Sequence, residues 1–142
     1  MPSLTIGKTD LVRLGPTMVV KLKIGTVAEH AQLKQGLVLP EVQPLNAMID
    51  TGAAATVIRE DILAKLNLRP TDQVRINTPT TSAYLCYRYW VRLVFPKDVT
   101  IETVVVSAPL EGQHVQCLIG RNVLSYSTFF YNGPEQSFTI GF

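Results

Sequence analysis

One carboxylate in the sequence, Asp50, lies at a position where a charged side chain would normally destabilise the fold. Asp50 directly follows a mostly apolar segment, residues 45–49, and precedes Thr51-Gly52-Ala53. A carboxylate beside a core destabilises the fold unless it is hydrogen-bonded or neutralised. Gly52 allows a tight turn that brings its backbone N–H to the carboxylate, and the Thr51 hydroxyl can bond a neighbouring backbone group. Asp50 is therefore a candidate for acid–base chemistry, with Thr51 and Gly52 shaping the loop around it.

The other reactive residue types predict no second site. His30 and His114 have no partner at the spacing of metal ligands. Cys86 and Cys117 are too few and too far apart for a disulfide framework or a zinc site, so they are expected to fill apolar space. The sequence contains neither a phosphate-binding loop nor a Ser-His-Asp set that can be placed. We expect no metal and no cofactor.

The elements that must position Asp50 are mostly strands. In residues 18–24 every second side chain is apolar, which is the period of a strand with one buried face. The longest such pattern is Tyr84–Phe95, whose odd-numbered residues from Leu85 onward share one face while Arg88 and Arg92 lie on the other. The other predicted strands are residues 45–49, 73–77, 100–107, 116–119, 128–131 and 137–142.

Few segments predict helices. Residues 60–66 carry apolar side chains on one side, and Pro70 bars any extension. A second short helix is expected after Gly120. Residues 26–44 have no clear period and are expected to form a surface excursion. The sequence therefore predicts a mostly β fold over residues 1–142, as a single domain with one or two short helices.

A second segment, about 68 residues after Asp50, reads Leu118-Ile119-Gly120-Arg121-Asn122-Val123-Leu124. Together with Asp50-Thr51-Gly52-Ala53, it resembles the two signature motifs of the retropepsin-like aspartic peptidases, the single-domain relatives of retroviral proteases. The resemblance covers roughly residues 15–142. It implies a closed β-barrel, an acid-protease half-fold, in which Gly120 and Arg121 lie beside the catalytic Asp50, Thr51 and Gly52.

A shared active site follows from the number of motifs. No other aspartate is followed by Thr-Gly or Ser-Gly, so a second catalytic carboxylate must come from a second chain. In a symmetric homodimer the two Asp50 carboxylates would share a proton and activate a water molecule. By resemblance, Thr51 hydrogen-bonds across the two-fold axis. We expect the dimer interface in residues 137–142, with residues 4–6 as the second candidate.

The resemblance also implies an extended polypeptide substrate, held under a β-hairpin flap. The flap corresponds to residues 73–89, with Thr78, Thr80, Thr81 and Ser82 at its tip, and Ala53, Ala54 and Ala55 line the opposite side. Two features depart from the retroviral pattern. The sequence has no glycine between Gly52 and Gly112, and alanines stand at positions 54 and 55 where retroviral enzymes usually carry acids, one of which pairs with the arginine that Arg121 matches.

Composition excludes several other classes. Hydrophobic residues make up 46% of the chain and charged ones 17%, which excludes a disordered protein. The net charge of +2 comes from scattered basic residues, so no nucleic acid partner is expected. No apolar run is long enough to span a membrane, and the N-terminus lacks the pattern of a secretory signal. We expect a cytoplasmic location and no membrane partner.

Two functions remain open from the sequence. The first is an aspartic endopeptidase that cleaves extended, largely apolar segments. The second is a dimerisation or peptide-binding module of the same fold with negligible turnover. The absence of glycine from the expected flap supports this alternative.

Overall fold

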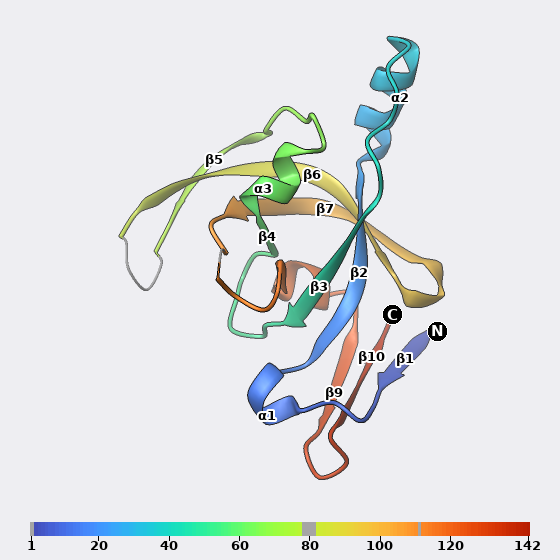
Figure 1. The fold of residues 1–142 in the computed structure, drawn as a ribbon, viewed down its shortest axis with the longest axis vertical. Coiled ribbons are helices and arrows are strands. Elements are labelled where there is room, and N and C mark those ends of the chain that lie inside the picture. Colours follow the sequence, from blue (N-terminus) through green and yellow to red (C-terminus); the bar gives the residue numbers. More distant parts are fainter. Residues whose placement is uncertain (1, 78–81, 111) are drawn as a thin grey trace.

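The structure is a computed structural model that describes residues 2–77, 82–110 and 112–142 (Figure 1). It is mostly β, with four short helices and one short 3₁₀ turn in the described residues. In chain order, the elements are β1 (Ser3–Ile6), α1 (Leu11–Leu14), β2 (Thr17–Ile24), α2 (Thr26–Lys34), β3 (Gln43–Ile49), β4 (Val57–Arg59), α3 (Glu60–Ala64), β5 (Asp72–Ile76), β6 (Tyr84–Phe95), the 3₁₀ turn (Pro96–Asp98), β7 (Val99–Ala108), β8 (Cys117–Ile119), α4 (Arg121–Leu124), β9 (Thr128–Asn132) and β10 (Ser137–Gly141).

Six strands form a closed barrel in the order β2-β3-β8-β4-β7-β6, and pairing of β2 with β6 closes it. β5 pairs only with β6 and so extends beyond the barrel. Two pairs are parallel, β3 with β8 and β4 with β7, and the others are antiparallel. The predicted closed barrel is therefore confirmed, and closure leaves its strands without unpaired edges.

The core fills the barrel from alternating positions. In β2, Val20 and Leu22 are fully buried, and Met18 and Ile24 are almost so. Burying a side chain of this size stabilises the fold by roughly 1.5–3 kcal/mol. The period of residues 18–24 thus predicted both the strand and its inward face.

The long strand β6 buries opposite faces in its two halves. In its second half Val91 and Leu93 are fully buried in the barrel. In its first half, Leu85 and Tyr87 are 41% and 42% exposed, whereas Cys86 on the other face is buried. The prediction of one common buried face is therefore wrong for the first half. The reason is that this half extends past the barrel to pair with β5, and here the face that carries Cys86 packs with Val106 and Ala108 of β7.

The helices α3 and α4 occupy the predicted segments, but α1 and α2 do not follow from the sequence pattern. The expected surface excursion of residues 26–44 begins instead with the nine-residue helix α2, which projects from the end of the barrel (Figure 1). The only buried residue of α2 is Gln32. Because only Ala28 of its apolar residues packs against the core, while Val27 and Leu33 are exposed, α2 carries no helical period of burial that the sequence could display. None of the helices in the described part of the chain has the length and apolar character of a membrane span.

A separate three-stranded sheet, in the order β1-β10-β9, packs against the barrel. Its central strand, β10, places Phe138 and Ile140 in the core, both with no exposed surface. Leu4 and Ile6 of β1 pack against the same core. The apolar face expected to form a dimer interface is therefore already buried within the chain. This face completes the core of its own protomer and is not available to a partner, so the predicted dimer interface in residues 137–142 and 4–6 stays a prediction for the rest of these strands.

Candidate active site

The Asp50 carboxylate sits at the end of β3, where the parallel pairing with β8 ends. The Asp50 backbone N–H donates to the Ile119 carbonyl at 2.9 Å, which continues the β3–β8 ladder by one residue. The Gly52 N–H donates to Asp50 Oδ1 at 3.0 Å. A Cβ at position 52 would lie only 3.2 Å from that oxygen, so glycine allows the close approach. The half-buried carboxylate is thus held by the backbone turn expected from the sequence.

Thr51 faces outward from this turn. Its side chain is exposed, and its hydroxyl makes no hydrogen bond to any residue in 2–77, 82–110 or 112–142. Its carbonyl accepts a hydrogen bond from Arg121 Nη1 at 2.9 Å. Arg121, which lacks the acidic neighbour of the retroviral pattern at positions 54 and 55, therefore binds the backbone of the loop itself.

The three alanines after Gly52 tie the loop to the start of α4. The Ala53 carbonyl accepts from the Arg121 N–H at 2.8 Å, and the Ala54 carbonyl accepts from the Asn122 N–H at 3.2 Å. Ala55 packs against a small apolar cluster beneath the β5–β6 hairpin. Residues 50–56, which we call the Asp50 loop, are therefore fixed by hydrogen bonds on one side and by packing on the other.

Gly120 makes this contact possible. A Cβ at position 120 would lie 2.4 Å from both the carbonyl carbon and the oxygen of Ala55 and 2.9 Å from the Thr56 nitrogen. These are backbone atoms, which cannot move aside as the tip of a side chain can. The residue's backbone is extended, with φ of −91°, so glycine is needed here for space rather than for an unusual torsion.

A buried polar pair behind the loop was not anticipated from the sequence. Thr56, with no exposed surface, donates from its backbone N–H and its hydroxyl to Asn122 Oδ1 at 2.9 and 2.8 Å. The Thr56 hydroxyl oxygen in turn accepts from the Gly120 N–H at 3.0 Å. Asn122 Nδ2 donates to the Val104 carbonyl at 3.1 Å. The available signal was a polar residue next to apolar neighbours in each motif: Thr56 between Ala55 and Val57, and Asn122 before Val123.

Strand β5 and the first half of β6 pair as an antiparallel hairpin within the residues expected for the flap, whose role in holding substrate stays a prediction. At its base Asp72 and Arg88 stand opposite each other, with Arg88 Nε 2.6 Å from Asp72 Oδ1. The hydrogen bond from Arg88 lowers the pKa of the Asp72 carboxyl from its usual value. Nearer the tip, Ser82 is exposed, and the Ala83 N–H donates to Asn77 Oδ1 at 3.1 Å.

Three of the expected substrate-contacting residues, Thr78, Thr80 and Thr81, lie outside the described residues. Their predicted contacts with the substrate remain a prediction.

The thiols and imidazoles lie apart from Asp50. Burial raises the pKa of the Cys117 thiol to about 12, and burial also raises the pKa of Cys86. His114 Nε2 lies 2.9 Å from the Leu14 carbonyl oxygen. No three histidine, cysteine or acidic side chains in the described ranges come together as metal ligands.

Comparison with known proteins agrees with this geometry. Residues 35–123, more than half of the chain, match the family described as aspartyl protease. No curated protein matches the chain.

Among solved structures, a retropepsin-like aspartic protease from Rickettsia conorii is similar, with 12% identity and a TM-score of 0.58 over 99% of this chain and 91% of that one. The EIAV protease in complex with the inhibitor HBY-793 has 18% identity and a TM-score of 0.51, over 78% of this chain and 86% of that one. At these identities the likeness concerns the fold. The chain therefore belongs to the aspartyl protease family, as an aspartic endopeptidase built on the retropepsin-like fold.

Proposed function

We propose that the chain is active as a symmetric homodimer in which Asp50 from each protomer forms one catalytic dyad. The observation that carries this proposal is that each chain supplies half a site. The sequence holds a single Asp-Thr-Gly, and the loop that carries it presents an exposed Thr51 beside the half-buried Asp50. A two-fold axis at this loop would complete the site with a second copy of the same carboxylate.

Two carboxylates at such an axis cannot both be ionised, so the pair holds one proton between them. The ionised member takes a proton from a bound water molecule, which attacks the scissile carbonyl carbon. The protonated member donates a hydrogen bond to the carbonyl oxygen. Thr51, whose hydroxyl has no partner within the described part of its own chain, supplies a hydrogen bond across the axis that joins the two loops.

The substrate is an extended polypeptide segment. The proposed contacts are Ala53, Ala54 and Ala55 below the substrate and Ser82 with Thr78, Thr80 and Thr81 above it. Since alanines replace acids next to Asp50, the site offers methyl groups where charged side chains would select polar residues. The small apolar cluster that packs on Ala55 supports a preference for apolar side chains.

Mixing active and inactive chains tests the shared dyad. Asp50→Asn preserves the shape of the side chain but cannot cycle a proton, so only dimers with two Asp50 residues should cleave. In an equal mixture that has exchanged subunits, activity should fall to about a quarter of that of wild type at the same total concentration, because two chains must both be wild type. Cleavage of unfolded casein at mildly acidic pH provides the assay.

The matched control is Asp98→Asn, at an exposed aspartate outside the site, which should leave activity unchanged in any mixture. Activity at half of the wild-type value would show that each chain works alone. Absence of cleavage by the wild-type protein would favour the binding module instead.

A cytoplasmic location is the remaining part of the proposal. Cys86 and Cys117 are both buried free thiols, an arrangement that suits a reducing compartment.

A further inference from the structure

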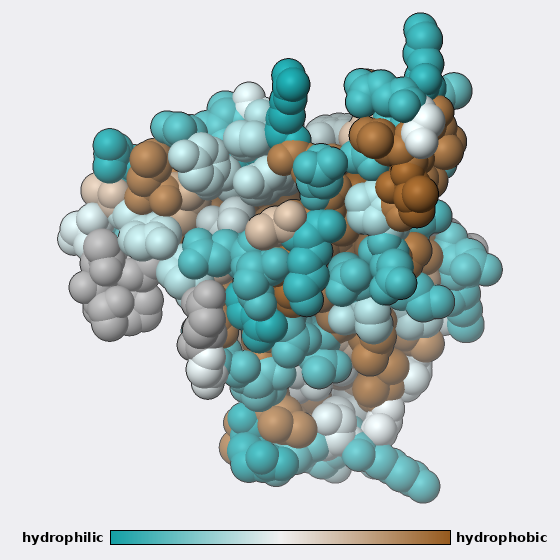
Figure 2. Space-filling view, turned by 45° about the horizontal axis from the view of Figure 1, so that its top comes forward, coloured by the Kyte–Doolittle hydropathy of each residue, from teal (hydrophilic) through white to brown (hydrophobic). Residues whose placement is uncertain are grey.

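Helix α2 and the segment after it expose an unusual number of apolar side chains. Val27 and Leu33 of α2 are 78% and 55% exposed, and Leu37 and Val38 beyond it are 44% and 94% exposed. Figure 2 shows apolar side chains gathered over this projecting part of the surface. The only buried residue of the helix is the polar Gln32. A helix whose glutamine is buried and whose aliphatic side chains are exposed presents an apolar surface to a binding partner.

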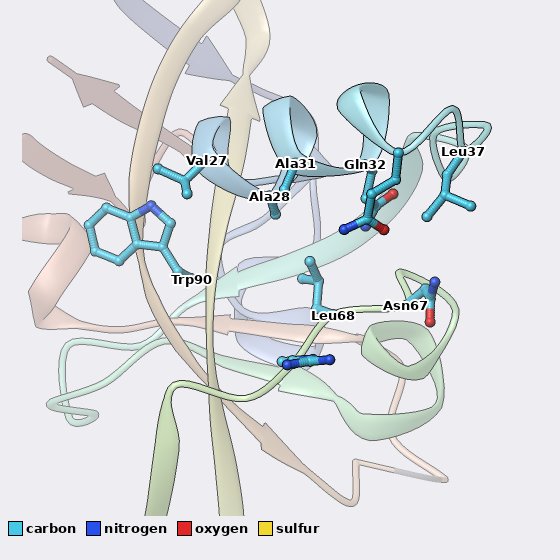
Figure 3. Close-up of a pocket in the computed structure, with 10 residues that line it drawn as sticks. Val27, Ala28, Ala31, Gln32, Leu37, Asn67, Leu68 and Trp90 are labelled. Carbon is cyan, nitrogen blue, oxygen red and sulfur yellow. The ribbon is translucent and has the colours of Figure 1, made fainter.

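A groove of about 850 Å³ runs beneath α2, between the helix and the segment that follows α3. Its volume is in the range of ligand-binding clefts. The lining combines aliphatic side chains, three carboxamides, an arginine and a tryptophan (Figure 3). The lining residues are Val27, Ala28, Ala31, Gln32, Gln35, Leu37, Asn67, Leu68, Arg69 and Trp90.

Gln32 is the feature that points to a ligand. It is 8% exposed, and its side-chain amide has no hydrogen-bond partner among the residues that the structure describes. Figure 3 shows this side chain directed from α2 toward the segment of Asn67 and Leu68, into the groove. The amide opens to the groove in the described part of the chain, so its donor and its acceptor are both available to a bound molecule.

We propose that this groove is a second peptide-binding site, which holds an extended, apolar segment of the polypeptide substrate that carries a carboxylate. A carboxamide offers both a donor and an acceptor, which matches the N–H and C=O of one peptide group. Side chains of an extended segment alternate in direction, so one set can enter the aliphatic part of the groove.

The charge of the groove selects the acidic side chain. Arg69 is the only charged residue of the lining, and it is exposed. The acidic residues near the groove are already engaged. Glu29 pairs with Arg92, and Glu102 accepts hydrogen bonds from Trp90 Nε1 at 2.8 Å and from the start of α2. A carboxylate in the bound segment would therefore meet a guanidinium without a competing anion.

The location favours a substrate segment over a second copy of the chain. This step rests on the proposed dimer, whose axis passes through the Asp50 loop. The groove lies at the opposite end of β3, and seven strand residues separate the two by on the order of 20 Å. The proposed two-fold contact is made by the Asp50 loop and does not itself involve α2. An extended polypeptide of on the order of ten residues spans that distance and could occupy both sites.

Peptide binding tests the site without any need for cleavage. The probe is a short fluorescein-labelled peptide in which leucine alternates with serine and one serine is replaced by glutamate. Binding is followed by anisotropy with the full chain carrying Asp50→Asn. We expect a further Gln32→Met substitution to weaken binding about fivefold, the loss expected for one peptide hydrogen bond. Arg69→Glu should reverse the preference, so that a lysine-containing peptide binds more tightly than the glutamate-containing one.

Two controls separate binding from folding. His30→Gln changes an exposed residue of the same helix outside the lining, and it should leave peptide binding unchanged. Gln32→Met should leave the free energy of unfolding unchanged or raise it, because the amide has no partner to lose. Equal peptide binding by the parent and the Gln32→Met protein would overturn the proposal. A lower stability of Gln32→Met would also overturn it, since the amide would then serve the fold.

Cleavage kinetics test whether the occupant is part of the substrate. Ala31→Trp fills the groove and should raise KM for unfolded casein while leaving KM for a short peptide substrate unchanged. An equal effect on both substrates, or on neither, would refute the assignment to the substrate. Concentration-dependent association that Ala31→Trp abolishes would identify a second copy as the occupant and overturn the proposal. Because anisotropy does not require turnover, a failed shared-dyad experiment leaves the binding result interpretable.

Discussion

Removal of the Asn122 side chain should lower the free energy of unfolding by more than the loss of a single hydrogen bond, because this side chain makes several buried bonds behind the Asp50 loop. Asn122 Oδ1 accepts two hydrogen bonds from Thr56, at 2.9 and 2.8 Å, and Asn122 Nδ2 donates to the Val104 carbonyl at 3.1 Å. In Asn122→Ala, the Thr56 N–H and hydroxyl lose their acceptor at a residue with no exposed surface. An unsatisfied buried polar group costs about 1–3 kcal/mol, so two of them predict a loss of about 2–6 kcal/mol. That is a large share of the roughly 5–15 kcal/mol that holds a typical domain folded.

A double-mutant cycle with Thr56→Val measures how far the two side chains act as one unit. Thr56→Val keeps the shape but removes the hydroxyl that donates to Asn122 and accepts from the Gly120 N–H. We expect the double variant to be more stable than the sum of the single losses predicts, by about 1–2 kcal/mol, because both substitutions remove the same bond. Urea unfolding provides the free energies.

The matched control for this cycle is Asn132→Ala. Asn132 Oδ1 accepts one exposed bond, from the Glu135 N–H at 3.2 Å, so its loss should cost about 1 kcal/mol or less. Cleavage by Asn122→Ala should be reduced even where the variant is folded, since the Asp50 loop loses its support. An Asn122→Ala loss no larger than that of Asn132→Ala, or strictly additive single losses, would refute the reasoning.

Three further predictions concern packing, pH and thiol reactivity. Gly120→Ala should lower the free energy of unfolding in urea by about 3 kcal/mol or more and reduce cleavage, because its Cβ would lie 2.4 Å from the Ala55 backbone. At Gly7 a Cβ would lie 4.0 Å from the Ser137 Cβ, so the control Gly7→Ala should be nearly neutral. Hydrogen bonds, first of all from the backbone N–H at the start of α2, lower the pKa of Glu102. Its contribution to stability is therefore present above the ordinary pKa of about 4.3 and is lost as the pH falls through the lower folded value, so Glu102→Gln should be less stable than wild type near pH 7 but not near pH 2. Because burial raises the pKa of Cys117 to about 12, iodoacetamide should label it at mildly alkaline pH only after unfolding, and labelling of the native chain at the rate of a free thiol would contradict the burial.

The sequence by itself determined most of the strands, though not β1 and β4, and the two motifs that meet at the candidate site. Alternation of apolar residues in residues 18–24 reports a local property, the pleat of a strand, so the burial of Val20 and Leu22 followed directly. The tight turn at Gly52 is equally local, because its N–H and the Asp50 carboxylate are two residues apart. Resemblance then placed Gly120 beside this loop, and the close approach of Ala55 accounts for the glycine.

Only the tertiary structure decided which polar and apolar groups meet across the chain. The hydrogen bond between Thr56 and Asn122 joins residues 66 positions apart, and neither residue type indicates which residue it will pair with. The apolar face of β10 is buried in the core of its own chain because the β1-β10-β9 sheet packs against the barrel, which no pattern within residues 137–142 reveals. Helix α2 likewise shows no period of burial because Val27 and Leu33 face solvent and the Gln32 amide faces a groove. Periodicity reports which side of an element is apolar, whereas the surface that covers that side depends on segments far away in the sequence.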